Sequence, residues 1–395
     1  MRTIDDFSFK EKRALIRVDF NVPLNDSFVI QDDSRMTASL PTIKKILNDG
    51  GSVVLMSHLG RPKNGPENKF SLKHLVPHLK KITGTDVVFS DNCISLDAIN
   101  TSKSLKSGTI HLLENLRFYP EETAGNNEFA RALSKHGDVY INDAFGTAHR
   151  SHASTAVIAN HFQDKCFGSL MAKEIKNASM LLEKPKRPFT AIVGGAKVSD
   201  KILIIQNLLN IADHIIIGGG MAYTFKYAQG GKIGDSLFEE DRVATCLEIL
   251  KEAEEKDIQI HLPGDSVIAD KFDNNATTEN CQSDQITEGW MGLDIGENAV
   301  KKFTSVLASS KTILWNGPLG VFELSAFENG TKSIAKAVSE ATQNGAFSLI
   351  GGGDSSAAVK KFGYTQKVSY VSTGGGALLE YFEGKKLPGI VAIEG

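Results

Sequence analysis

Basic side chains follow several short apolar runs in the first half of the chain. Arg35 lies in the connection after the first run, and the others follow later runs: His58, Arg61, Arg117 and Arg150. Each alone is more often a solvated or salt-bridged surface residue. Guanidinium groups bind phosphate or carboxylate oxygens two at a time, so the set together suits a small polyanion such as a phosphorylated acid.

Two polar residues directly after the first run complete this predicted anion site. Asp19 and Asn21 would orient the hydroxyl groups of the substrate. For His58 two interpretations remain open: a neutral histidine that satisfies its own loop, or a direct contact with phosphate.

Glycine-rich segments follow five apolar runs in the second half. They are Gly194-Gly195-Ala196, Gly218-Gly219-Gly220, Asn316-Gly317-Pro318, Gly351-Gly352-Gly353-Asp354 and Gly374-Gly375-Gly376. Glycine lets the backbone approach a ligand, and a helix that begins there directs free N–H groups at phosphate oxygens. One such segment is more often a tight turn, but five predict a nucleotide site. Neither the P-loop motif nor G-x-G-x-x-G occurs, which argues against P-loop enzymes and standard dinucleotide-binding dehydrogenases.

Charged residues lie beside these glycines. Lys197 and Lys201 are expected at the start of a helix, where a spacing of four puts both ammonium groups on one face. The alternative is a pair of exposed helix lysines. Asp354 is either a cap in the first turn of a helix or a Mg²⁺ ligand that acts together with nucleotide phosphates. Glu323 could accept hydrogen bonds from ribose hydroxyls or be a surface carboxylate.

The apolar runs are β-branched and alternate with amphipathic stretches, which predicts parallel sheets covered by helices. Ligands of such sheets bind beyond the carboxyl ends of the strands, so the residues above would converge there. The expected strands are Ala14–Val18, Val53–Met56, Val87–Phe89, Ile110–Leu113, Val139–Ile141, Thr190–Val193, His214–Ile217, Ile258–His261, Thr312–Trp315, Phe347–Ile350 and Val368–Val371.

A length of 395 residues exceeds the roughly 250–300 at which one core usually stops growing, so two domains are expected. Leu170, Ile175, Leu181 and Leu182 form a helical stripe that stops before Pro185, which marks the junction. The polar stretch Asp273–Asp284 is expected to be a surface loop.

Composition excludes several partners. The 44 basic and 47 acidic residues nearly cancel, so no global charge holds nucleic acid or an anionic membrane. The four cysteines lie far apart without a C-x-x-C pair, which indicates reduced thiols and the cytoplasm. The N-terminus lacks the apolar core of a signal peptide, and no run approaches the ~18 apolar residues of a membrane span.

Eight segments, in order along nearly the whole chain, resemble the phosphoglycerate kinase family. They are Arg17–Pro23, Ser57–Pro62, Leu113–Phe118, Asn142–Arg150, Gly194–Val198, Trp315–Pro318, Gly351–Asp354 and Ser372–Gly376. Two departures are small: Ser355 stands where many members have threonine, and Leu319 where others have valine or methionine.

The resemblance implies a role for each matching residue. The 3-phosphoglycerate site would comprise Asp19, Asn21, Arg35, His58, Arg61, Arg117 and Arg150. The nucleotide site would comprise Gly195, Ala196, Lys197, Lys201, Gly219, Gly292, Asn316, Gly317, Glu323, Gly351, Gly352, Gly353, Asp354 and Ser355, with Asp354 as the Mg²⁺ ligand. Gly292 enters only through the resemblance.

It also implies two Rossmann-like domains, each a mainly parallel sheet with helices on both faces, joined by a hinge helix. The expected parts are 1–169 with 374–395 returning to it, the junction 170–188, and the nucleotide domain 189–373. A working monomer is implied, with ATP or ADP and 1,3-bisphosphoglycerate or 3-phosphoglycerate as small-molecule substrates.

The acceptor would be a carboxylate, which needs no general base, so alignment and charge neutralisation would carry catalysis. The expected catalytic groups are Arg35, Lys197, Lys201, Gly353 and Gly376. Two rivals remain. A dehydrogenase would bind nicotinamide, and a non-catalytic two-lobed anion-binding protein would bind the anion without nucleotide.

Overall fold

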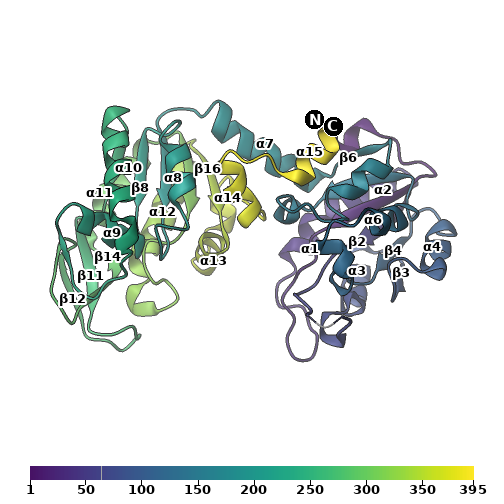
Figure 1. Ribbon diagram of the computed structural model, residues 1–395, viewed down its shortest axis with the longest axis horizontal. Coiled ribbons are helices and arrows are strands. Elements are labelled where there is room, and N and C mark those ends of the chain that lie inside the picture. Colours follow the sequence, from purple (N-terminus) through teal and green to yellow (C-terminus); the bar gives the residue numbers. More distant parts are fainter. Residues whose placement is uncertain (64) are drawn as a thin grey trace. The chain divides into compact units, whose positions relative to one another are not determined.

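The computed structural model describes residues 1–63 and 65–395. The chain forms two compact units, which we call the first unit (Met1–Lys176 with Lys385–Gly395) and the second unit (Asn177–Gly384). Each contains a parallel six-stranded sheet with helices around it (Figure 1), which confirms the expected fold class.

All neighbouring strands of the first unit's sheet run parallel, so their carboxyl ends lie at one edge. Strands β2 and β5 are buried along their whole length, as strands in the middle of a sheet with helices on both faces are. In sheet order the strands are β3 (Val87–Ser90), β4 (Ile110–Leu113), β2 (Ser52–Met56), β1 (Arg13–Val18), β5 (Val139–Asp143) and β6 (Lys165–Phe167).

Short helices cover this sheet and form part of the connections between its strands. The C-terminal helix packs against β6, and Asn142 Nδ2 donates to Gly389 O at 3.2 Å, which ties the end of the chain to β5. The helices are α1 (Ser34–Ala38), α2 (Leu40–Asn48), α3 (Val76–Thr83), α4 (Leu96–Lys103), α5 (Pro120–Thr123), α6 (Asn127–Ser134) and α15 (Pro388–Glu394).

The main sheet of the second unit is also parallel throughout, so the five predicted glycine segments follow strands that end at the same edge. In sheet order its strands are β10 (Gln259–His261), β8 (His214–Ile217), β7 (Phe189–Val193), β15 (Thr312–Asn316), β16 (Phe347–Gly351) and β17 (Tyr370–Val371).

Helix α7 (Ser169–Glu183) runs from the first unit into the second and ends before Pro185, as the apolar stripe predicts. The other helices of the second unit are α8 (Ile202–Leu208), α9 (Met221–Ala228), α10 (Val243–Glu255), α11 (Glu297–Ser309), α12 (Asn329–Gln343), α13 (Gly353–Lys361) and α14 (Gly376–Phe382). In Figure 1 they surround the green and teal strands.

The prediction that Asp273–Asp284 is a loop is wrong in part. Strand β12 (Thr278–Gln282) forms the edge of an antiparallel sheet with β11 (Asp265–Ala269) and β14 (Met291–Ile295). Four of the five β12 side chains are exposed, so the strand has no apolar alternation and is held by its backbone pairing with β11. A two-stranded parallel sheet pairs β9 (Lys232–Ile233) with β13 (Gln285–Ile286).

The chain rejoins the first unit at Lys385, later than the expected position 374. The reason is that α14 packs on α8, with Ala377, Leu378 and Phe382 buried and Asn207 Nδ2 donating to Phe382 O. All four cysteines are free thiols. Within residues 1–63 and 65–395, no helix has the length and apolarity needed to cross a membrane.

Candidate active site

The first of the predicted anion-binding residues, Asp19, directly follows β1. It is 8% exposed and forms an ion pair with Arg35, which lies on α1. Burial alone would raise the pKa of Asp19, but interactions with His58, Arg35 and Arg17 outweigh burial and keep the pKa below its ordinary value. Asp19 is therefore a fixed negative charge that orients Arg35.

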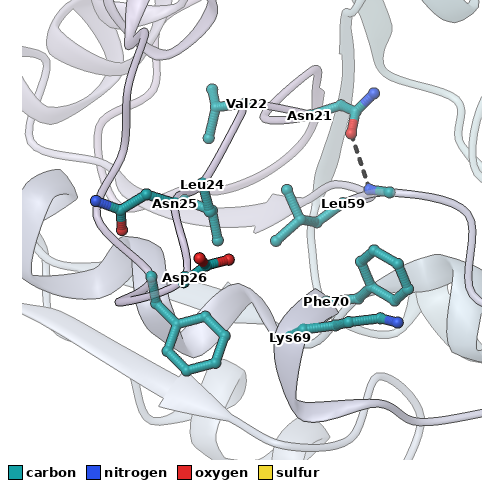
Figure 2. A pocket seen from close by; sticks show the side chains of 10 residues that line it. Asn21, Val22, Leu24, Asn25, Asp26, Leu59, Lys69 and Phe70 are labelled. Carbon is teal, nitrogen blue, oxygen red and sulfur yellow. Dashed lines mark hydrogen bonds between the residues drawn. The ribbon is translucent and has the colours of Figure 1, made fainter.

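Asn21 connects the loops after β1 and β2. Its Oδ1 accepts a hydrogen bond from Gly60 N at 2.8 Å (Figure 2), and its own N–H donates to Asp19 Oδ1 at 3.2 Å. The same region borders a hollow of about 410 Å³ between Phe28 and Phe70. Asn21 thus fixes the loop that carries His58 and Arg61.

The other basic residues gather around Arg117, which follows β4. Burial lowers the pKa of Arg117, and the nearby positive charges of Arg17, Arg61 and Arg150 lower it further. Arg61 and Arg117 also line one hollow of about 320 Å³. Like charges held this close in a folded protein favour an anion that neutralises them.

Arg17, which is fully buried on β1, is a site residue that its position in the sequence did not predict. Its Nη2 lies 3.3 Å from His58 Nδ1, and its Nε donates to Ser154 Oγ at 2.9 Å. Ser154 Oγ in turn donates to Glu122 Oε1 at 2.6 Å. The serine hydroxyl therefore links the buried guanidinium of Arg17 to the buried carboxyl group of Glu122. A charged residue inside the otherwise apolar run Ala14–Val18 was the available signal.

In the second unit, residues after β7, β8 and β15 line one hollow of about 480 Å³ together with β14. We call this hollow the second-unit pocket. Of the predicted nucleotide set it contains Gly195, Ala196, Gly219, Gly292, Glu323 and Asp354.

Glycine is required at several of these positions because strand-end loops touch. Gly317 has φ +103°, and a Cβ there would overlap the carbonyl of Gly194. Gly219 has φ +69°, and its Cβ would collide with the backbone of Gly195. A Cβ on Gly292 would overlap the hydroxyl of Tyr223. At Gly219 and Gly317 backbone therefore packs directly on backbone, and a side chain at either position would separate the loops.

Asn316, at the end of β15, links three of the predicted residues. It accepts a hydrogen bond from the ammonium group of Lys201 and donates from Nδ2 to Gly351 O at 2.9 Å. A Cβ on Gly352 (φ +91°) would press on the same amide. Ser355 is fully buried, and its Oγ accepts from Gly317 N at 2.6 Å, which gives the hydroxyl a structural partner.

The prediction that both lysines open a helix is wrong. Helix α8 begins at Ile202, so Lys201 is its N-cap residue and Lys197 lies in the preceding loop. Ser199 holds this loop through hydrogen bonds to the carboxylate of Glu239. Burial lowers the pKa of Lys201, whereas Lys197 is exposed and lies near the charge of Glu239.

Asp354 lies in the first turn of α13, as predicted, and its negative charge acts on Lys201. Gly353 is the first residue of α13 and Gly376 the first of α14, with open space where each Cβ would lie. Residues 1–63 and 65–395 contain no group of three or more metal-binding side chains. A carboxylate beside glycine-rich strand ends fits Mg²⁺, which proteins usually hold through one or two carboxylates and the substrate's phosphates.

Other residues of the pocket were not predicted. Leu237 and Phe272 are 56% and 62% exposed at the pocket, and Tyr223, Asp235 and Asp294 line it as well. They lie on α9, on β14 and in connections, and none of them directly follows a strand of the main sheet in the sequence. The rule that ligands bind beyond strand ends therefore could not find them.

Comparisons with known proteins agree on one family. A family model described as phosphoglycerate kinase matches residues 4–385. The phosphoglycerate kinase of Porphyromonas gingivalis is 52% identical over 418 aligned residues, covering 100% of both chains, and that of Chloroherpeton thalassium is 47% identical, covering 99% of this chain and 98% of the relative. The solved phosphoglycerate kinase of Coxiella burnetii has a TM-score of 0.90 at 38% identity and covers 99% of this chain and 98% of that one. The chain therefore belongs to the phosphoglycerate kinase family.

Proposed function

We propose that the protein catalyses the reversible transfer of a phosphoryl group between 1,3-bisphosphoglycerate and ADP, giving 3-phosphoglycerate and ATP. One observation carries this proposal: a single chain has an arginine-bearing sheet edge in one unit and a glycine-walled pocket at the sheet edge of the other. Together they provide for the two substrates that such a transfer requires.

The first unit would bind 3-phosphoglycerate. Arg61, Arg117 and Arg150 supply positive charge for the phosphate, and the Asp19–Arg35 pair would meet the end of the substrate where the phosphoryl group moves. The acceptor is a carboxylate without a proton to lose, so no general base is needed. This fits an edge built mainly from cations.

The second unit would bind the nucleotide in its pocket, with Glu323 toward the ribose and the glycine loops toward the phosphates. Mg²⁺, held by Asp354 and the nucleotide phosphates, would neutralise phosphate charge. Catalysis would rest on in-line alignment and on charge neutralisation by Arg35, Lys201 and the backbone N–H groups of Gly353 and Gly376. Lys197 would also neutralise charge on the phosphoryl group after a movement of the exposed loop that carries it.

Transfer would follow a hinge closure about α7 that brings both substrates in line and excludes water. A scattering profile unchanged by both substrates together would contradict this closure. We further propose that the protein works as a cytoplasmic monomer on small molecules, without nucleic acid or membrane.

The test combines the purified protein with ATP, Mg²⁺ and 3-phosphoglycerate and follows acyl phosphate formation through a coupled reductive step. Arg35→Ala should lower kcat by ~10³ or more, because one well-placed cation is worth that much in comparable transfers. Lys10→Ala removes a cation from an exposed site as a control and should leave kcat unchanged. Absence of acyl phosphate with the unaltered protein would refute the proposal.

A further inference from the structure

A backbone turn after β15, Pro318–Gly320, joins the walls of the second-unit pocket. Its carbonyl groups accept hydrogen bonds from both neighbouring glycine loops: Gly195 N donates to Pro318 O at 3.1 Å, and Gly219 N donates to Leu319 O at 3.2 Å. The three residues of the turn themselves line the pocket. The position of this turn therefore sets the position of both loops.

The N–H groups of the same turn depend on one side chain. Leu319 N and Gly320 N both donate to Oγ1 of Thr331, at 3.1 and 3.2 Å. Thr331 is fully buried in the first turn of α12 and is not among the residues that line the pocket. Buried N–H groups that lose their acceptor are costly, so the turn should move when this hydroxyl is removed.

Asp294 fixes the helix end that carries Thr331. Its Oδ2 accepts from Gly330 N at 2.7 Å, in the first turn of α12, and its Oδ1 accepts from Ile295 N at 2.9 Å. Gly320 and Gly330 pack so closely on this carboxylate that a Cβ at either would overlap it. Pocket strand β14, helix α12 and the turn thus meet at Asp294.

We propose that Thr331, held in register by Asp294, is a positioning residue that fixes the Pro318–Gly320 turn and through it the two glycine loops that bind the nucleotide. The inference rests on the proposed function, because it assigns the pocket to ADP and ATP. Without the hydroxyl, only a fraction of the molecules holds the turn in the arrangement that binds nucleotide. The apparent nucleotide affinity is then the intrinsic affinity multiplied by that fraction.

The test compares Thr331→Val, which removes the hydroxyl at nearly constant shape, with Thr331→Ser, which keeps it. Thr331→Val should raise the Kd for ADP and the nucleotide KM by ~10-fold while the KM for 3-phosphoglycerate stays within about twofold, and Thr331→Ser should restore the nucleotide KM. Thr342→Val is the matched control. Thr342 lies on the same helix, and its hydroxyl forms hydrogen bonds with Val338 O and Ser348 Oγ. Removing this hydroxyl should leave both KM values unchanged.

Calorimetric titration of the unaltered protein with ADP separates the two claims. If the unaltered protein binds no nucleotide, the proposed function fails. If it binds ADP and folded Thr331→Val binds equally well, or if both KM values rise together, the inference about Thr331 is overturned. If Thr331→Val does not fold, Thr331→Cys replaces it in the test, because a thiol has a similar size but is a weaker hydrogen-bond acceptor than a hydroxyl. A nucleotide KM of Thr331→Cys equal to that of the unaltered protein would then overturn the inference.

Discussion

Nη2 of Arg17 lies 3.3 Å from Nδ1 of His58, and both side chains are buried. A guanidinium group can only donate, so Nδ1 of His58 must be the acceptor and the ring hydrogen must lie on Nε2. Burial and the charge of Arg17 lower the pKa of His58 to about 3, so the ring is neutral at physiological pH. His58 is therefore a neutral donor through Nε2.

This tautomer predicts different outcomes for two substitutions. His58→Gln can place an amide N–H near the position of Nε2, whereas His58→Asn reaches only to the position of Nδ1. If His58 contacts the substrate, His58→Asn should raise the KM for 3-phosphoglycerate by about tenfold and His58→Gln clearly less. Steady-state kinetics of both variants decide the question, and equal KM values would assign His58 to the loop alone.

A second prediction concerns Gly317, where backbone conformation and close packing coincide. Gly317→Ala should both destabilise the protein and weaken nucleotide binding, because its Cβ would separate the loops after β7 and β15. Gly345→Ala is the matched control, since Gly345 has a similar φ of +93° but open space around its Cβ. The control should cost only about 1–3 kcal/mol of unfolding free energy from backbone strain, with ADP affinity unchanged. Urea denaturation and ADP titration measure the two effects.

Most strands of both main sheets could be predicted because they contain short apolar runs that are followed by glycine or polar residues. Strand β6 was not predicted, because its three residues include a lysine and form too short an apolar run. The exposed strand β12 could not be predicted either, since only its pairing with β11 makes it a strand. Lys197 was misplaced because helical spacing was assumed from Gly195 onward, while hydrogen bonds from Ser199 to Glu239 hold that segment as a loop. A partner 40 residues away cannot be predicted from the residues next to Lys197.

The site residues differ in the same way: some follow from local sequence and topology, and others depend on partners that are distant in sequence. Arginines and glycines at strand ends were found because parallel topology alone brings them together. Arg17 was missed because it lies within a strand, and its importance depends on His58 and Ser154, which are distant in sequence. Thr331 was missed because its partners are backbone groups.

Asp354 should determine the response to Mg²⁺. Asp354→Asn removes the proposed carboxylate ligand and should raise the half-saturating Mg²⁺ concentration by roughly tenfold or more, with a fall in kcat. Asp200→Asn is the control, because Asp200 also acts electrostatically on Lys201 but does not line the pocket. Rates measured over a Mg²⁺ series would contradict the assignment if both variants responded alike.

Two buried histidines of the first unit predict how its stability depends on pH. Cys93 O can only accept, so His136 carries its hydrogen on Nε2, and Ser102 Oγ must donate to His136 Nδ1. His111 Nδ1 then donates to Ser102 Oγ, at 2.8 Å. His111 Nε2 then accepts from Ser90 Oγ, at 2.8 Å, and an extra proton on His136 Nδ1 would displace the hydrogen that Ser102 Oγ donates to it.

Burial lowers the pKa of both His111 and His136 to about 4, from an ordinary value of 6.5. Between these values the unfolded chain binds protons that the folded chain does not, so the free energy of unfolding should fall as the pH decreases from 6.5 toward 4, by up to about 3 kcal/mol per histidine. Burial raises the pKa of Asp143 and Asp294 to about 7, which contributes with the opposite sign, so the histidines must be isolated by difference.

His136→Gln provides that difference, because its amide can still donate to Cys93 O but does not titrate. Urea denaturation across this pH range should give a shallower loss of stability toward acid for His136→Gln than for the unaltered protein. Ser102→Ala leaves both histidines in place, so it should lower stability at every pH while the histidines continue to titrate. Parallel stability curves for His136→Gln and the unaltered protein would show that protonation of this chain is not linked to unfolding.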